Sequence, residues 1–369
     1  PGSAEAGDQI VLVDYARTWG TYSMFIDSNG LNFQGEADTY IVEYDTSGAT
    51  VNIVYSGASK GWTPISDDVV TDAPVAPPTQ KAIFAFGFVN AGSETNVSNL
   101  VSSNGTVGND VTGVGTARTY FCGASYGSDK GIMAFGGALT GANKTGVSNL
   151  ISNQGVVASD TSAVGTARLN PGAAGFGTTG QAIFAYGSSA SGNSTIVNFI
   201  SNSGVVASDS SGAGTARNNP EGARYGVGLA IMAYGDTGSN TNISNKISSS
   251  GVIASDTSGV GTARTGLGGT SYGGDKAIFA YGTGDTNISN LVSNTGVVSS
   301  DVSGVGTARN NVAGTNYGGD LGLFGYGLSG STNQNMTNKV SNQGVVASDT
   351  TGVGTARVMP SACGYSLSA

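Results

Sequence analysis

GVVSSDVSGVGTAR, residues 296–309, ends in the phrase Gly-Thr-Ala-Arg, which occurs six times in the 369-residue chain. Successive arginines of this phrase lie 50, 49, 47, 45 and 48 residues apart. Regular self-similarity of this kind is the signature of a repeat architecture. Helical repeats are excluded, because the chain contains 61 glycines and no amphipathic helix can be drawn through its Gly, Ser and Thr content. The six repeats are therefore expected to be built from strands.

Each repeat resolves into four short strand-like runs, which the fifth copy shows most clearly. We expect its strands over residues 264–273, 276–282 and 287–294, with a fourth that opens at 296–301. Gly, Asn, Asp and Ser separate the runs, as tight hairpin turns require. Four antiparallel strands, repeated at this period, predict the blade of a β-propeller.

The two ends of the repeat region complement each other. The region starts at Lys81 with the second strand of a repeat and finishes with a lone first strand over residues 357–369. Joined, the two pieces complete one repeat. Such a join closes a ring of blades, whereas an open solenoid does not need it. The predicted fold is therefore all-β: a six-bladed β-propeller of four-stranded blades over residues 81–369, with the last blade closed by the C-terminal strand.

The second strand of every repeat is apolar and ends in an aromatic residue and a glycine. Its copies are AIFAFG at Ala82, GIMAFG at Gly131, AIFAYG at Ala182, AIMAYG at Ala230, AIFAYG at Ala277 and GLFGYG at Gly322. With an Arg near the start of each repeat, this order resembles the kelch repeat family over residues 81–369. The kelch double glycine is mostly a single glycine here, and the usual Trp of the fourth strand is absent. The resemblance implies a divergent, kelch-like propeller.

Residues 1–66 carry a different pattern, with strand-like runs at 10–15, 22–26, 39–44 and 49–55. The opening GDQIVLVD and the stretch from Tyr55 to Trp62 resemble a short β domain of phage tail-fibre and related virion proteins. We therefore predict a small fibre- or adaptor-like β domain over residues 1–66, continuing an upstream shaft. Residues 67–80 contain three prolines and predict a semi-rigid linker. The alternative is a surface loop docked on the propeller.

Composition excludes several functions. The net charge of −9 opposes nucleic-acid binding, and the chain has no apolar run of the roughly 18 residues that membrane insertion needs. The chain has no histidine to act as a general base or metal ligand, and no Gly-rich phosphate loop. Cys122 and Cys363 make neither a disulfide framework nor a zinc site, and we expect them to be small buried residues on first strands of adjacent blades. We expect a non-enzymatic protein without metal or cofactor.

An aspartate precedes each repeat arginine by eight residues. Identical pairs in every repeat favour structural ties between neighbouring strands, whereas a ring of charges that binds a cation, an anion or a sugar is the alternative. The aromatic residues that recur in every repeat are likewise assigned to packing between blades rather than to sugar binding. The structural pairs are Asp110 and Arg118, Asp160 and Arg168, Asp209 and Arg217, Asp256 and Arg264, Asp301 and Arg309, and Asp349 and Arg357.

The segments that differ between repeats are better candidates for binding, because loops on a rigid scaffold usually carry it. The loop after the second strand varies most, and all six copies are expected on one face, where their Asn, Ser and Thr side chains suit hydrogen bonding to glycans. Plain solvated loops are the alternative. The binding candidates are Asn90, Ser93, Asn143, Lys144, Asn193, Asp236, Asn240, Asp285, Asn333 and Gln334.

These observations favour a bacteriophage virion component, a tail fibre or similar appendage, whose propeller binds a glycan or protein receptor on the host surface. One alternative is a structural decoration or assembly protein whose loops contact other virion proteins. The other is a carbohydrate-active enzyme, which would use acids outside the repeated aspartates, such as Glu94 and Glu221. The resemblance to phage fibres also implies a homotrimer.

Overall fold

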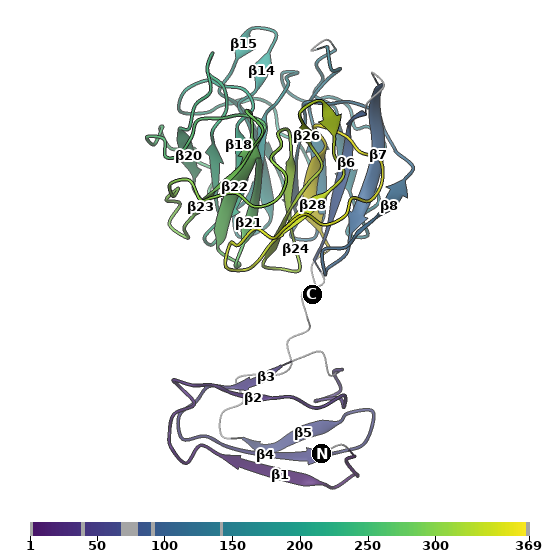
Figure 1. Cartoon of the computed structure of the whole chain (residues 1–369), viewed down its shortest axis with the longest axis vertical. Coiled ribbons are helices and arrows are strands. Elements are labelled where there is room, and N and C mark those ends of the chain that lie inside the picture. The colour runs from purple at the N-terminus through teal and green to yellow at the C-terminus, as the bar shows by residue number, and fades with distance from the viewer. Residues whose placement is uncertain (1–2, 38–40, 68–79, 90–92, 141–142, 367–369) are drawn as a thin grey trace. The chain divides into compact units, whose positions relative to one another are not determined.

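The computed structural model describes residues 3–37, 41–67, 80–89, 93–140 and 143–366. It is all-β, with many small antiparallel sheets (Figure 1). The chain divides into two compact units. In the described residues, unit 1 ends at Asp67 and unit 2 begins at Gln80. The predicted linker over 67–80 lies outside the described residues except for these two end positions.

Unit 1 contains two small sheets. One has the strand order β1-β4-β5, and the other pairs β2 with β3. Tyr44, Val51, Ile53 and Trp62 are at most 3% exposed and form the centre of its core. The strands are β1 (Gln9–Val13), β2 (Met24–Ile26), β3 (Val42–Tyr44), β4 (Thr50–Tyr55) and β5 (Trp62–Asp67).

A buried carboxylate fixes one turn of unit 1. Asp14 follows β1 and accepts hydrogen bonds from the backbone amides of Thr18, Trp19 and Gly48 at 2.8–3.0 Å. Burial alone would raise the pKa of Asp14, but the amide donors outweigh it and hold that pKa below its usual value. The turn before β4 is thereby tied to the end of β1.

The described residues of unit 2 contain six sheets of three or four strands, which we number I to VI in chain order. Each first strand pairs with a second strand, which pairs with a third. Sheet I is β29 (Ser361–Tyr365), β6 (Lys81–Val89), β7 (Ser93–Val101) and β8 (Val107–Val111); sheet II is β9 (Cys122–Tyr126), β10 (Lys130–Ala134) and β11 (Ser148–Ile151); sheet III is β12 (Gly172–Phe176), β13 (Gln181–Ala185), β16 (Ile196–Ile200) and β17 (Ser210–Ser211). Sheet IV is β18 (Glu221–Tyr225), β19 (Leu229–Ala233) and β20 (Ser244–Ile247); sheet V is β21 (Gly268–Tyr272), β22 (Lys276–Gly282) and β23 (Thr286–Val292); sheet VI is β24 (Ala313–Tyr317), β25 (Leu321–Gly325) and β28 (Thr337–Val340).

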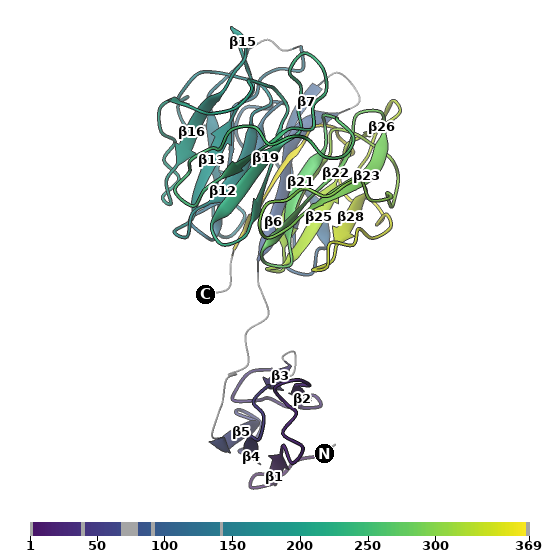
Figure 2. The ribbon, with the colours of Figure 1, turned by 90° about the vertical axis from the view of Figure 1, so that its left-hand side faces the viewer.

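The six sheets follow one another in a closed cycle. Each first strand contacts the first strand of the next sheet, in the order β9, β12, β18, β21, β24, β29 and back to β9. Sheet I contains both ends of unit 2, because β29 pairs antiparallel with β6, with Cys363 opposite Ile83 (Figure 2). The repeat region starts with a second strand and ends with a first strand, and these two strands pair in one sheet.

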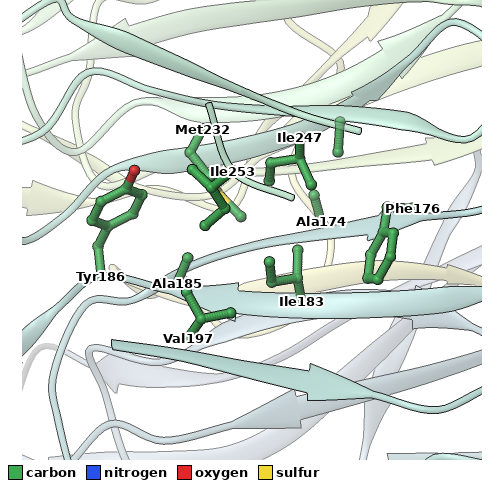
Figure 3. Close-up of a cluster of buried hydrophobic side chains, with 10 residues drawn as sticks. Ala174, Phe176, Ile183, Ala185, Tyr186, Val197, Met232, Ile247 and Ile253 are labelled. Atoms are coloured by element: carbon green, nitrogen blue, oxygen red, sulfur yellow. The ribbon is translucent and has the colours of Figure 1, made fainter. Parts of the chain in front are cut away.

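The core lies between successive sheets. Figure 3 shows one such layer, in which Ile183 and Tyr186 from sheet III pack with Met232 and Ile247 from sheet IV. These four side chains are fully buried. Each contributes about 1.5–3 kcal/mol relative to an exposed position. Similar clusters join the other sheets, so stability depends on neighbours around the whole cycle.

The strands expected for the fifth repeat agree with the structure to different degrees. The second strand has the predicted bounds, whereas the first begins only at Gly268. The fourth is not a continuous strand there: Val298 and Val302 make isolated bridges to β23. Between these bridges the Asn290 side chain donates to Ser299 O at 3.1 Å and to the Asp301 carboxylate at 2.9 Å. Four strands, as predicted, are present in sheets I and III, whereas in the other four sheets the fourth run makes only isolated bridges to the third strand.

Two further hairpins extend from the sheets. They lie in the loops that follow the second strands of sheets III and VI. Their strands are β14 (Ser188–Ser189) with β15 (Gly192–Asn193), and β26 (Leu328–Ser329) with β27 (Thr332–Asn333).

Candidate functional site

The repeat arginines are buried, each at most 2% exposed. In sheet VI, Arg309 donates from Nε to Tyr326 O at 2.9 Å, from Nη1 to Thr307 O at 3.0 Å and from Nη2 to Asn338 Oδ1 at 2.6 Å. Its guanidinium also lies 4.1 Å from the ring centroid of Tyr281, a residue of the preceding sheet. The arginine therefore ties its own sheet together and packs against its neighbour.

The repeat aspartates complete this network from the partly exposed side. Asp349 accepts from the Thr307 amide at 3.0 Å, from Thr307 Oγ1 at 2.7 Å and from Asn338 Nδ2 at 2.9 Å. Arg309 Nη1 lies 3.9 Å from Asp349 Oδ1. Burial would raise the pKa of Asp349, but the bonds from Thr307 and Asn338, together with Arg309, hold it below its usual value. The carboxylate stays ionised and caps the segment that precedes the first strand.

The charged partners differ from those that the eight-residue spacing suggested. Arg118 lies 4.0 Å from Asp160, in its own sheet, and not beside Asp110. Thr116 donates to that same Asp160, 44 residues away in sequence. Asp110 instead receives the bonds of Thr355, two residues before Arg357, so this network joins the two ends of unit 2. The eight residues between each aspartate and the following arginine are the segment that leads from the end of one sheet to the start of the next.

An asparagine in each third strand belongs to the network, and the sequence reasoning missed it. These six side chains are fully buried. Each donates to the aspartate of its sheet at 2.9 Å. A sequence signal existed, because each asparagine precedes that aspartate by 11 residues. They are Asn99, Asn149, Asn198, Asn245, Asn290 and Asn338.

The aromatic residue at the end of each second strand has a left-handed backbone, with φ between 59° and 67°. A β-bulge accompanies it where the second strand continues, as between Ala280 and Gly282. The rings are at most 1% exposed and stack under the arginines of the next sheet. They therefore face the protein interior rather than a ligand. The residues are Phe86, Phe135, Tyr186, Tyr234, Tyr281 and Tyr326.

The loops after the second strands hold one another in a circle of hydrogen bonds, which we call the loop circle. Every loop bonds to the next, and the sixth bonds to the first. The bonds join Leu139 N to Glu94 Oε1 (2.7 Å), Lys144 Nζ to Ser189 O (2.7 Å), Asn193 Nδ2 to Asp236 O (2.9 Å), Asn240 Nδ2 to Thr283 Oγ1 (3.2 Å), Gly330 N to Asp285 Oδ2 (2.6 Å) and Asn333 Nδ2 to Phe88 O (3.0 Å).

Most binding candidates from the sequence are members of this circle. Lys144, Asn193, Asp236, Asn240, Asp285 and Asn333 all take part in its bonds. Gln334 donates to Thr332 O within its own loop at 3.0 Å. Ser93 and Asn143 are exposed, and Asn90 lies outside the described residues. The loop face thus offers a pre-organised surface whose polar side chains are largely engaged with neighbouring loops.

A second circle, the turn circle, lies at the opposite ends of the strands, where first strands turn into second strands. There a backbone amide of each turn donates to a carbonyl of the next, at 2.7–2.9 Å. The bonds run from Gly127 to Gly180, Gly177 to Gly228, Gly226 to Asp275, Gly273 to Asp320, Gly318 to Gln80 and Ser366 to Asp129.

The first strands surround an axial channel. A ring of six small residues lines both of its cavities and separates them. The cavity toward the turn circle has a volume of about 410 Å³, and the other about 50 Å³. The ring consists of Gly123, Ala173, Gly222, Gly269, Gly314 and Ala362.

One first strand places charge in this channel. Glu221, the first residue of β18, lines the small cavity, and Arg224 of the same strand lines the large one. The other first strands begin with Cys, Gly, Gly, Ala and Ser. Burial raises the pKa of Glu221 to about 8, against a lowering effect of the Gly222 amide. The spacing of the repeats did not point to either residue. The sequence signal was that they are charged, whereas the other first strands carry uncharged residues.

The two acids considered for catalysis lie in different places. Glu94 accepts a bond from the Leu139 amide in the loop circle, whereas Glu221 lies in the axial cavity. Both cysteines are free: Cys363 is buried in β29, with its thiol pKa raised to about 12 by burial, and Cys122 of β9 donates to Pro171 O. In the described ranges, no group of three or more His, Cys, Asp and Glu side chains could hold a metal ion.

Replacing Glu221 by Gln is expected to stabilise unit 2 at alkaline pH. Because the folded pKa lies above the ordinary value of 4.5, the wild type loses stability as pH rises from about 4.5 to about 8, while the Gln variant does not. The gain at pH 8.5 should be about 4 to 5 kcal/mol and should vanish near pH 4.5. Urea unfolding across this range measures it, with Asp320→Asn as the control acid on a turn. A gain in stability that did not change with pH would contradict the assignment of Glu221 as an acid that is neutral in the folded protein.

The comparisons with known proteins add no relative. No protein-family model and no curated protein sequence matches this chain. No helix long and apolar enough to cross a membrane occurs in the part of the chain that the structure describes.

Proposed function

We propose that unit 2 is a six-bladed, kelch-like β-propeller whose last blade is completed by the C-terminal strand. Three observations support this: six sheets in a closed cycle, a sheet shared by the two ends, and a buried arginine and a buried asparagine at the same positions of every sheet. In this assignment sheets I to VI are the blades, and the first strands line the axis.

On this fold, the function that the residues support best is that of a non-enzymatic bacteriophage virion appendage, a tail fibre or similar protein. Its propeller is the head that binds the host cell surface or its glycans. The resemblance of the first 66 residues to phage-fibre β domains supports the virion assignment. Such a protein would be located in the virion, and the same resemblance supports a homotrimer.

The single observation that carries a binding role is the loop circle. Its loops differ from repeat to repeat in length and side chains, yet each is held by its neighbour. A surface that is variable in chemistry but fixed in position loses little conformational entropy on binding. Its exposed Asn and Ser residues, such as Asn143 and Ser93, suit hydrogen bonds to sugar hydroxyls.

A second candidate is a decoration or assembly protein of the virion, and unit 1 favours it. Val11 and Val13 on β1 and Ile65 on β5 are 55–59% exposed, and Phe25 on β2 is 60% exposed. Apolar surface of this kind suits contact with other virion proteins. The two roles are compatible if unit 1 attaches to the particle and unit 2 contacts the host.

The binding role is tested with the fluorescently labelled full chain on a panel of bacterial strains. We expect saturable binding to a subset of strains, weakened about tenfold when Ser93 and Asn143 are both changed to Ala. The matched control changes Gln154 and Gln343, which are exposed on turns between third and fourth strands, to Ala. Binding to no strain would overturn the role, and equal loss in both double variants would overturn the loop face as its site.

A further inference from the structure

Among the six first strands around the axial channel, only β18 carries charged side chains. At the position before the final aromatic, the first strands carry Ser125, Gly175, Arg224, Ser271, Asn316 and Gly364. Five of these residues are small or neutral, and one is a cation. The strand β18 thus places a cation in the wall of the larger of the two axial cavities.

Arg224 is held in position but has no acidic partner. Its Nη2 donates to Gly177 O, in a turn of the preceding sheet, at 3.0 Å. No carboxylate lies within 4.0 Å of it in the described parts of the chain. Asp275 also lines the cavity, but it is engaged by Lys276 at 2.9 Å and by Asn294 at 3.1 Å. The guanidinium is thus anchored at one nitrogen, with donors left for an external anion.

Arg224 is exposed in the cavity wall, so an incoming anion can reach it. The groups around it remove part of the hydration of its cationic form, which lowers the pKa of Arg224. An incoming carboxylate would replace that hydration with a charge-assisted, fork-like pair of hydrogen bonds.

The rest of the cavity wall is polar and neutral. Ser125 Oγ donates to Gly364 O at 2.8 Å and Ser271 Oγ donates to Arg224 O at 2.9 Å, so both hydroxyl oxygens remain able to accept. The Asn316 side chain adds an amide at the same level of the wall. The volume of about 410 Å³ lies within the roughly 300–1,000 Å³ typical of small-ligand sites.

We propose that this cavity binds a sugar that carries a carboxylate, with Arg224 paired to the carboxylate and Asn316, Ser125 and Ser271 bonded to hydroxyls. The proposal deepens the proposed function, on which it rests, by naming acidic saccharides as a ligand class. It also places the site at the turn circle, on the face opposite the loops. The narrow ring of Gly and Ala at the base of the cavity limits the ligand to one end of the channel.

Isothermal titration of the full chain with glucuronate and with N-acetylneuraminate tests the proposal, with glucose and acetate as comparison probes. At least one acidic sugar should bind more tightly than both comparison probes. Arg224→Gln should weaken that sugar at least tenfold, and Asn316→Ala should weaken it severalfold. Arg17→Gln in unit 1, the same change of charge, should have no effect. Equal unfolding midpoints would show that the variants remain folded.

Three results would overturn the site: no binding of either acidic sugar, unchanged binding by Arg224→Gln, or acetate binding as tight as that of the sugars. Strain binding by the Arg224→Gln chain separates this proposal from the proposed function. If that chain still binds the same strains while the wild type ignores both acidic sugars, the cavity proposal fails and host binding stands. If neither chain binds any strain, host binding fails, and the titration alone decides the cavity.

Discussion

Arg309→Met should lower the free energy of unfolding of unit 2 by about 3 kcal/mol or more. The change leaves the carbonyls of Tyr326 and Thr307 and the Asn338 side-chain oxygen without their buried donor. It also removes the cation that packs on Tyr281. Arg309→Lys should recover little of this loss, because a single ammonium cannot reproduce three bonds in a fork. The midpoint and slope of urea unfolding measure the effect.

Lys339→Met is the matched control for this experiment. Lys339 lies in the same sheet, and its Nζ donates to Asn104 O at 2.8 Å in an exposed position. Its loss should cost less than about 1 kcal/mol. If the two variants were equally stable, the buried network would not be what holds the sheet to its neighbour.

Gly222→Ala is expected to prevent unit 2 from folding to its native state, although it adds only one methyl group. A Cβ at this position would lie 2.1 Å from the carbonyl oxygen of Ala173, because β12 and β18 approach closely at the axis. The contact is with backbone, so no rotamer change can relieve it, and the first strands would have to separate. The cost should exceed the roughly 1–3 kcal/mol of ordinary overpacking. Circular dichroism and thermal unfolding measure the outcome.

Gly108→Ala provides the comparison, because a Cβ there would meet only Leu100 O at 3.4 Å on the exposed strand β8. Its effect should stay within about 0.5 kcal/mol. Gly314→Ala, with Gly269 O at 2.3 Å, should repeat the result of Gly222→Ala in another sheet. A native-like Gly222→Ala protein would mean that the axis is wider than the structure shows.

The elements that the sequence predicted best are those defined by apolar side chains. The second strand of sheet V spans Lys276–Gly282, as expected, because its run of buried residues has no competing conformation. The pairing of β29 with β6 also followed from sequence, since both halves of a repeat were present at the two ends. Hydrophobic pattern and repeat period were sufficient for these features.

What the sequence did not reveal depends on side-chain bonds between distant segments. Spacing placed Asp110 with Arg118, whereas the chain brings Asp110 to Arg357, because a sheet ends and the next begins within those eight residues. The polar loop residues were expected to face a ligand, but Asn333, for example, is 5% exposed and bonds the neighbouring loop. The local sequence pattern cannot distinguish a side-chain amide that is free to bind a ligand from one that is hydrogen-bonded to a neighbouring loop.

The pairing of β29 with β6 has a consequence for biosynthesis. A ribosome releases β6 at the beginning of unit 2 and β29 only at its end, so the cycle of sheets cannot close until Tyr365 has been synthesised. Until then β6 is an open sheet edge, with unpaired amides and carbonyls that could accept the equivalent strand of another nascent chain. The strand β29 therefore closes the cycle of sheets when it pairs with β6. Where several copies are synthesised close together, the speed of this pairing would decide between separate chains and chains that have exchanged β29.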